Sequence, residues 1–167
     1  MKIVDKLLGK KSFVDEAKKI GVNIGKNVII AEGIVWGTEP YLISVGDDSL
    51  VSLRVTFINH DGSINVLRNL KNDHTMDIIK PIKIGKNCFI GAESLILYGT
   101  NIGDNVIVGA RSLVKGELES GFVYAGSPAK KICTVEEFYK KHEGDILHTK
   151  QMSPEEKEKF LRDKFLK

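Results

Sequence analysis

The stretch Ile84-Gly85-Lys86-Asn87-Cys88-Phe89 returns 18 residues later as Ile102-Gly103-Asp104-Asn105-Val106-Ile107. Each hexad opens with an aliphatic residue, continues with a small residue and two polar or small ones, and carries a small or β-branched residue in fifth place. The same step recurs in the pairs Ile24-Gly25, Ile30-Ala31, Trp36-Gly37, Val45-Gly46, Val51-Ser52, Ile90-Gly91 and Val108-Gly109. A fixed internal period predicts stacked repeats, because each repeat can bury its apolar side only against its neighbours.

A hexad of this kind is one short strand followed by a turn. The aliphatic residue points into a prism, the fifth residue must be small enough to share that interior, and the glycine with the polar pair makes the corner, where a positive φ and close approach are needed. Three hexads close one triangular coil, so Ile84 should stack on Ile102. Ile24 and Val45 are 21 residues apart, which predicts a three-residue insertion near residues 39–41. The sequence therefore predicts a mainly β fold, a parallel β-helix.

Composition sets outer limits on the function. The chain has 167 residues, a formal net charge of +3 and a sequence pI near 8.7, as expected for one domain of ordinary size. It has no basic stripe interleaved with aromatic residues, so we expect no nucleic-acid partner. The N-terminus carries no long apolar run, so we expect no signal peptide, no membrane span and a cytoplasmic location. Cys88 and Cys133 predict no disulfide framework, and Cys88 is expected to pack inward.

Three regions divide the chain. Residues 1–20 predict an N-terminal helical cap that begins after Ser12, residues 21–132 the β-helix, and residues 133–167 a C-terminal helical extension. Residues 63–81 break the period and predict a long loop, and loops of this length in a compact domain are usually functional. Residues 121–131 are too irregular to predict another coil. The helices expected at 134–147 and 153–166 each begin with a capping box, formed by the pairs Thr134 with Glu137 and Ser153 with Glu156.

His60 is the first candidate for chemistry. It stands where the coil that contains Phe57 should turn, and the period fails directly after it. Histidine is largely neutral at pH 7 and can accept a proton from an attacking hydroxyl group. The alternative is a solvent-facing turn residue, since Asn-His-Asp-Gly is rich in turn formers. His74, in the middle of the loop, is the rival histidine, while His142 and His148 are expected to face water.

The hexads of residues 21–132 resemble those of the hexapeptide-repeat acyltransferases. Two segments, 36–43 (WGTEPYLI) and 55–62 (VTFINHDG), look like the version found in sugar and polysaccharide O-acetyltransferases, and residues 125–130 (AGSPAK) resemble that family's closing motif. The resemblance implies a left-handed β-helix and transfer of an acetyl group from acetyl-CoA to a hydroxyl group of a sugar or polysaccharide. It also implies a homotrimer with active sites between subunits, and no metal.

The resemblance also implies roles for single residues. His60 would be the general base, and the backbone N–H of Ala92 would stabilise the oxyanion. Acetyl-CoA would lie against Ala92 and Ala110, with its phosphates near Lys130 and Lys131. Lys115 is a further candidate for the cofactor, displaced by one position from the cation that many relatives carry. The candidates for acceptor contacts are Trp36, Glu39 and His74; Trp36 also fills an inward position and could be structural.

Other functions remain open on the residues alone. The acceptor could be serine, an antibiotic or another small hydroxyl compound, although serine acetyltransferases usually carry a larger N-terminal helical domain. A zinc hydratase on the same fold needs three convergent histidines, and residues 84–113 contain none. A non-catalytic scaffold would bind no coenzyme A. No serine or cysteine stands beside His60 in the sequence, so we expect direct transfer without an acyl-enzyme.

Overall fold

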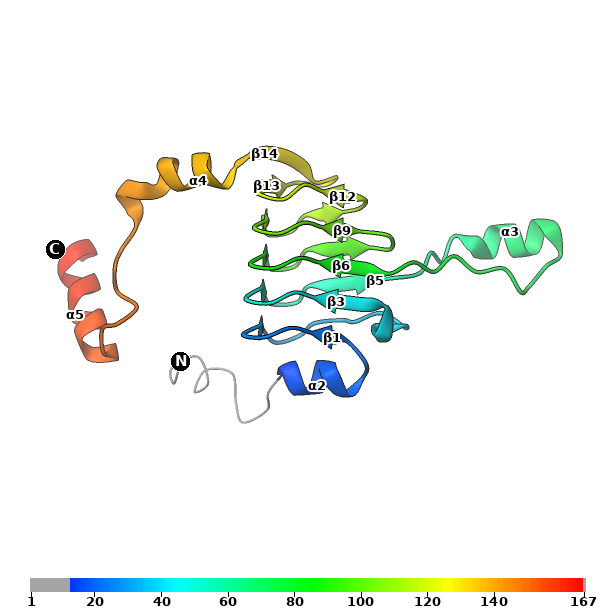
Figure 1. The fold of residues 1–167 in the computed structure, drawn as a ribbon, viewed down its shortest axis with the longest axis horizontal. Coiled ribbons are helices and arrows are strands. Elements are labelled where there is room, and N and C mark those ends of the chain that lie inside the picture. Colours follow the sequence, from blue (N-terminus) through cyan, green and yellow to red (C-terminus); the bar gives the residue numbers. More distant parts are fainter. Residues whose placement is uncertain (1–12, 167) are drawn as a thin grey trace.

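Short strands stack into three sheets in the computed structural model, which describes residues 13–166 (Figure 1). The chain winds around a prism, and the strands pair in parallel with those one coil above or below, except in the antiparallel hairpin at the upper end. The first face consists of β1 (Asn23–Ile24), β3 (Ile43–Val45), β6 (Ile82–Ile84), β9 (Asn101–Ile102) and β12 (Glu117–Leu118). The second consists of β2 (Ile29–Ile30), β4 (Leu50–Val51), β7 (Phe89–Ile90), β10 (Ile107–Val108), β13 (Phe122–Ala125) and the antiparallel β14 (Lys130–Thr134). The third consists of β5 (Thr56–Ile58), β8 (Leu95–Leu97) and β11 (Leu113–Val114).

The strand register reproduces the period read from the sequence. Ile84 lies beside Ile102, so the 18-residue coil is confirmed. In the lower coils Ile24 lies beside Val45 and Val35 beside Thr56, and both pairs are 21 residues apart. The extra residues therefore follow Val35, where the 3₁₀ helix η1 (Pro40–Leu42) stands. This confirms the insertion expected near residues 39–41.

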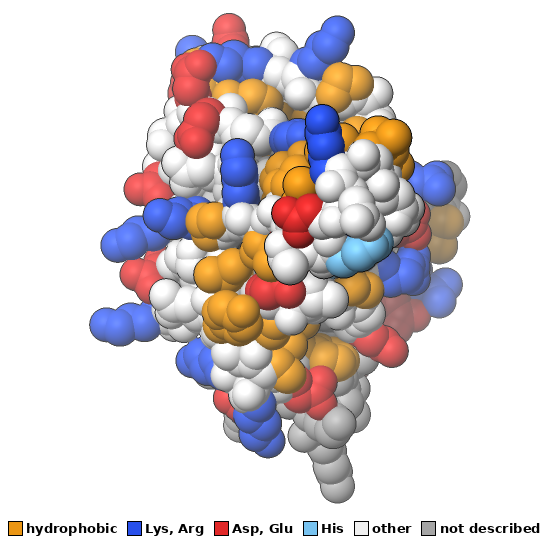
Figure 2. Space-filling view, turned by 90° about the vertical axis from the view of Figure 1, so that its right-hand side faces the viewer, with side chains coloured by type: hydrophobic (Ala, Val, Ile, Leu, Met, Phe, Trp, Pro, Cys, Tyr) orange, Lys and Arg blue, Asp and Glu red, His pale blue; other side chains and the backbone are white. Residues whose placement is uncertain are grey.

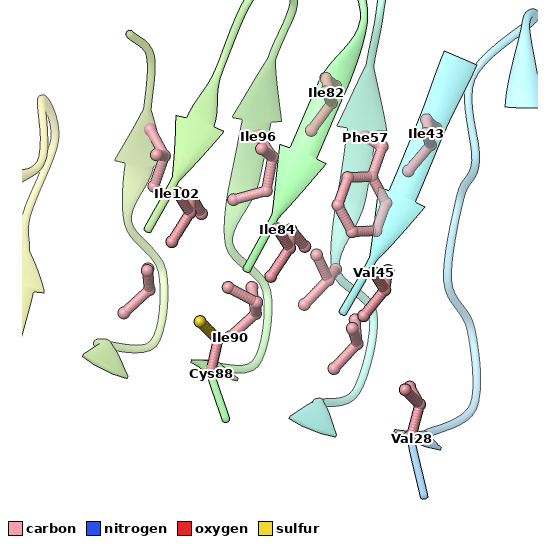
Figure 3. Packing of buried hydrophobic residues seen from close by; sticks show 14 of the residues in the cluster. Val28, Ile43, Val45, Phe57, Ile82, Ile84, Cys88, Ile90, Ile96 and Ile102 are labelled. Atoms are coloured by element: carbon pink, nitrogen blue, oxygen red, sulfur yellow. The ribbon is translucent and has the colours of Figure 1, made fainter. Parts of the chain in front are cut away.

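Aliphatic side chains from all three faces fill the prism (Figure 3). Val51, Ile90 and Val108 are fully buried on the second face, and burying one such side chain contributes about 1.5–3 kcal/mol. The fifth residues of the hexads are also buried and small; they include Val28, Ser49, Cys88 and Val106. Cys88 packs inward as expected, and burial raises the pKa of its thiol.

Each corner has two requirements, close stacking and a positive φ, and they fall on different residues of the hexad. A Cβ atom on Gly85 would lie 2.6 Å from the carbonyl carbon of Gly103, so close stacking requires glycine there. Positive φ falls on the fourth residue instead, with Asn87 at 51° and Asn105 at 55°. Within the corner that the glycine and the polar pair were expected to make, the glycine thus allows the close approach and the second polar residue takes the positive φ. Asparagine suits the left-handed conformation, and Nδ2 of Asn87 also donates to Oδ1 of Asn105 at 2.7 Å.

Residues 63–81 leave the prism, as the broken period predicts, but they are not all loop. They contain helix α3 (Ile64–Lys71), which projects away from the coils (Figure 1). Ile64 is buried, whereas Val66, Leu67 and Leu70 are exposed. Figure 2 views the side on which α3 lies, where apolar side chains gather between charged ones.

The ends of the prism carry the remaining elements. Helix α2 (Phe13–Lys19) packs against β1 and β2 and buries Ala17; the rest of the expected cap, with Ser12, lies outside the described residues. At the other end β13 stacks in parallel on β10. The expectation that residues 121–131 are too irregular for another coil is therefore wrong for β13. This part of the coil lies 16 rather than 18 residues above the one below, because the turn before β12 is shortened: Leu118 already lies beside Ile102.

The C-terminal extension leads away from the top of the prism, on the side opposite α3 (Figure 1). It consists of α4 (Val135–His142), the 3₁₀ helix η2 (Glu143–Asp145) and α5 (Pro154–Phe165). Both predicted capping boxes are present.

Candidate functional site

His60 lies at the corner after β5, at the root of the excursion. It forms an isolated antiparallel bridge with Ile79. On either side of this bridge the N–H of Asp61 donates to the carbonyl oxygen of Ile78, and the N–H of Lys80 donates to that of Asn59, both at 2.9 Å. The two ends of the excursion are thus held together beside the histidine.

The ring of His60 contacts two residues of the coil below. Its Nδ1 lies 3.0 Å from Oγ1 of Thr38, and that hydroxyl donates to Oε2 of Glu39 at 2.6 Å. Oε2 of Glu39 also lies 3.9 Å from Nδ1 itself. The His60 side chain is 36% exposed and that of Glu39 19%. Within residues 13–166 the other ring nitrogen, Nε2, has no hydrogen-bond partner, so it is available to a substrate.

Asn59 and Gly37 hold this arrangement in place. Asn59 is completely buried, and its Nδ2 donates to the backbone carbonyl of Glu39. Gly37 has a φ of 70°, and a Cβ there would lie 2.6 Å from Oδ1 of Asn59. The segment that carries Thr38 and Glu39 is therefore fixed against the corner that carries His60.

A second polar cluster ties the excursion to the coils above. The hydroxyl of Tyr98 donates to Oδ2 of Asp61 at 2.6 Å, and Nζ of Lys115 donates to the Tyr98 oxygen at 3.0 Å. The N–H of Ser63 donates to Oδ1 of Asp61. The hydrogen bonds from Tyr98 and Ser63 lower the pKa of Asp61 to about 2. Lys115, expected at the cofactor, thus lies on the His60 side of the prism.

Ala92 and Ala110 stack on each other at a different corner, between the second and third faces, because Ile90 pairs with Val108. The turn at residues 126–129 lies next to this corner: the N–H of Leu113 donates to Gly126, and the N–H of Ala129 donates to Leu113. Lys130 follows as the partner of Ala125 in the β13–β14 hairpin.

The neighbouring lysine is differently placed. Nζ of Lys131 pairs with Glu119 at 2.8 Å and lies over the ring of Phe122. Lys130 forms no ion pair within the described part of the chain. Of the two lysines, Lys130 is therefore the one whose charge is not already paired with a carboxylate of the described chain.

One chain does not bring all the expected site residues together. Ala92 precedes the third-face strand β8, whereas His60 follows β5, the strand that pairs with β8. The third face therefore separates them, and three residues of strand alone span about 10 Å.

The other candidates have distinct surroundings. The Trp36 ring stacks on that of Phe57, with centroids 4.9 Å apart and planes 1° apart, so it packs on the core. His74 is exposed in the excursion. His142 lies against Phe138 and 3.8 Å from Asp145, while His148 is exposed.

Sequence reasoning missed the roles of Thr38, Asn59 and Tyr98. Thr38 lies in the 36–43 segment that carried the resemblance. That segment pointed to this region of the chain, but nothing in it indicated that Thr38 contacts His60. No hexad rule marks Tyr98, which follows β8 at an ordinary corner. Among residues 13–166 no group of three or more metal-binding side chains occurs, and none of the helices there is long and apolar enough to cross a membrane.

Comparison with known proteins agrees with this geometry. A family model described as hexapeptide repeat of succinyl-transferase matches residues 7–35 and 81–111. Protein CapG of Staphylococcus aureus is 35% identical over 166 residues, which cover 98% of this chain and 95% of CapG. The galactoside O-acetyltransferase of Escherichia coli is 31% identical over 111 residues, which cover 66% of this chain and 53% of that protein.

Solved structures show the same fold. A hexapeptide-repeat acetyltransferase from Vibrio cholerae, in complex with acetyl-coenzyme A, superimposes with a TM-score of 0.61 at 25% identity. The match covers 69% of this chain and 61% of that one. The repeated hexads, the prism that they build and the match along nearly the whole of CapG lead to one conclusion: the chain belongs to the hexapeptide-repeat acetyltransferase family.

Proposed function

We propose that this protein transfers an acetyl group from acetyl-CoA to a hydroxyl group of a sugar or glycan. The observation that carries the proposal is His60, held at the root of the excursion with Nδ1 engaged and Nε2 directed to no residue of the described chain. The similarity to a galactoside O-acetyltransferase supports a sugar acceptor, and the family membership supports the left-handed winding of the coils.

His60 acts as the general base. Its Nε2 accepts the proton of the acceptor hydroxyl while that oxygen attacks the thioester carbonyl, and it then returns the proton to the departing sulfur. Base catalysis of this kind contributes about 10²–10⁴-fold to the rate. The backbone N–H of Ala92 stabilises the negative charge on the carbonyl oxygen.

The corner at Ala92 and Ala110 fits a pantetheine arm. Both side chains end at Cβ, so the outside of the stacked coils leaves room beside them for a narrow chain. Acetyl-CoA supplies the acetyl thioester there, and its phosphates lie near Lys130 in the β13–β14 hairpin. Lys131 and Lys115 are weaker candidates for the phosphates. Lys131 already pairs with the carboxylate of Glu119, and Lys115 already donates to Tyr98 beside Asp61.

A homotrimer completes the site. Because His60 and Ala92 lie at opposite edges of the third face, a site that uses both must join one subunit's His60 to another's Ala92, and rotational symmetry repeats that junction in every interface. His74 and Glu39 are then candidates for acceptor contacts, and Trp36 contributes mainly by packing beneath the corner. We place the protein in the cytoplasm, where acetyl-CoA is available.

The first experiment is calorimetric titration of the protein with acetyl-CoA, in parallel with Lys130→Ala and with Lys150→Ala as a control lysine far along the C-terminal extension. We expect saturable binding that weakens in Lys130→Ala and is unchanged in Lys150→Ala. Release of free thiol with a panel of sugar acceptors then tests turnover, with His60→Ala against His74→Ala. No binding at millimolar acetyl-CoA would remove the proposal.

A non-sugar acceptor, such as an antibiotic, is the second candidate within the same chemistry. The same panel distinguishes it, because thiol release would then occur with the small hydroxyl compound and not with sugars. A scaffold without catalysis would bind no acetyl-CoA.

A further inference from the structure

Three polar groups form a continuous line at the catalytic corner. Oε2 of Glu39 accepts from the Thr38 hydroxyl at 2.6 Å, and the Thr38 oxygen lies 3.0 Å from Nδ1 of His60. Thr38 and His60 are 22 residues apart and come from successive coils. The line ends at the ring, since Nε2 on the other side has no partner within residues 13–166.

The direction of these hydrogen bonds follows from counting donors. A threonine hydroxyl has one hydrogen, and an ionised carboxylate can only accept. The Thr38 hydrogen therefore belongs to Glu39, and the Thr38 oxygen can only accept from the ring. Nδ1 of His60 must then carry a hydrogen, which leaves the lone pair of a neutral imidazole on Nε2.

We propose that Thr38 and Glu39 are positioning residues that fix the tautomer of His60, with the Glu39 carboxylate acting through the Thr38 hydroxyl. The proposal rests on the proposed function, in which Nε2 takes the acceptor proton. The opposite tautomer carries hydrogen on Nε2 and cannot accept that proton. Once Nε2 is protonated, the carboxylate 3.9 Å from Nδ1 stabilises the positive ring.

Neighbouring residues hold the Thr38–Glu39 segment in place and leave Glu39 as the carboxylate that faces the His60 ring. Asn59 holds the backbone of Glu39, and Gly37 allows the close approach of this segment to Asn59. Asp61 is adjacent to His60 in sequence, but its two oxygens accept from Tyr98 and Ser63. Glu39 is therefore the carboxylate that faces the ring, which differs from the role of acceptor contact suggested by the sequence.

Nitrogen-15 NMR of the imidazole rings tests the tautomer without any substrate. The four histidines of the chain are assigned with His60→Asn, and His74 and His148 provide exposed references. Above the pH at which the ring is protonated, we expect the wild type to show a protonated Nδ1 and an unprotonated Nε2 at His60. Thr38→Val, which keeps the shape and removes the hydroxyl, should shift this signal toward a mixture of tautomers, and Thr38→Ser should restore it.

Kinetics provide the second readout. General base catalysis is worth about 10²–10⁴-fold, so we expect Thr38→Val to lower kcat about 10- to 100-fold with little change in the acceptor KM. Glu39→Gln should have a smaller effect in the same direction, because glutamine can either accept from or donate to Thr38. The control is Glu117→Gln, since that carboxylate accepts from Asn101 at 2.7 Å on the first face, away from the corner.

The outcomes separate this proposal from the proposed function. An unchanged His60 tautomer in Thr38→Val, or a rise in acceptor KM at constant kcat in Glu39→Gln, would overturn the positioning role and return Glu39 to an acceptor contact. Full activity of His60→Ala would instead refute the general base itself, whatever the tautomer is.

Discussion

The hydroxyl of Tyr98 donates a 2.6 Å hydrogen bond to Asp61, the residue next to His60. Tyr98 follows β8, whereas Asp61 opens the excursion from the coil below, so this bond joins the root of the excursion to the next coil. Together with the N–H of Ser63 it holds the pKa of Asp61 at about 2. The corner that carries His60 is thus supported from below by Thr38 and from above by Tyr98.

Tyr98→Phe should raise the pKa of Asp61 toward its ordinary value near 3.8. Because the pKa in the folded protein is lowered, the ionised Asp61 stabilises the fold above its ordinary pKa, and this contribution is lost as the pH falls from about 4 to about 2. The stability difference between wild type and Tyr98→Phe should therefore shrink across that range. Urea unfolding at pH 7, 4 and 2.5, with carbon-13 NMR titration of Asp61, measures both effects. Lys115→Met, which keeps the tyrosine, should shift the pKa much less; an equal shift would assign the effect to the lysine.

Phe57→Ala should destabilise the prism by about 3–5 kcal/mol, because Phe57 is completely buried and its ring also stacks on Trp36. Phe165→Ala, at a side chain 61% exposed on α5, serves as the control and should cost little. Chemical denaturation of both variants provides the comparison. Equal losses would show that the stack contributes no more than an exposed ring.

Gly85→Ala should cost about 1–3 kcal/mol, because the new Cβ would lie 2.6 Å from the carbonyl of Gly103 and the coils would have to separate. Gly144→Ala is the matched control, since nothing lies within 4 Å of its Cβ position. Thermal unfolding compares the two. A tolerated alanine at Gly85 would contradict the close stacking of these coils.

Two inactive chains should restore activity when they are combined, if each site joins two subunits. His60→Ala removes the base, and Ala110→Trp blocks the corner proposed for the pantetheine arm. Co-expression at equal levels should then return about a quarter of the wild-type sites. In random assembly about half of the sites receive His60 from a chain in which it is intact, and about half of those receive an intact Ala110 from the neighbouring chain. Acetyl transfer by the purified mixture provides the measurement. Activity no greater than the sum of the separate variants would place His60 and Ala110 in the same subunit's site.

The hexads allowed much of the fold to be predicted, but not its irregular parts. The 18-residue coil and the insertion before Val45 follow from counting residues, and the register confirms both. Helix α3 was not predicted because its residues have no six-residue step. Strand β13 was not predicted because the shortened turn before β12 shifts it out of the frame of the earlier hexads. His60 was predicted from its place at the break in the period, and its ring contacts were not.

What the sequence by itself determined is the prism: which residues face inward, where coils close and where the chain departs from them. It could do so because these are properties of neighbouring residues repeated in one frame. Only the tertiary structure decided that Thr38 and Glu39 meet His60. Those residues belong to different coils, and the 21-residue offset between the coils brings Thr38 level with the corner at Asn59 and His60. A contact made by stacking depends on the length of the whole coil between the two residues, and no local pattern contains it.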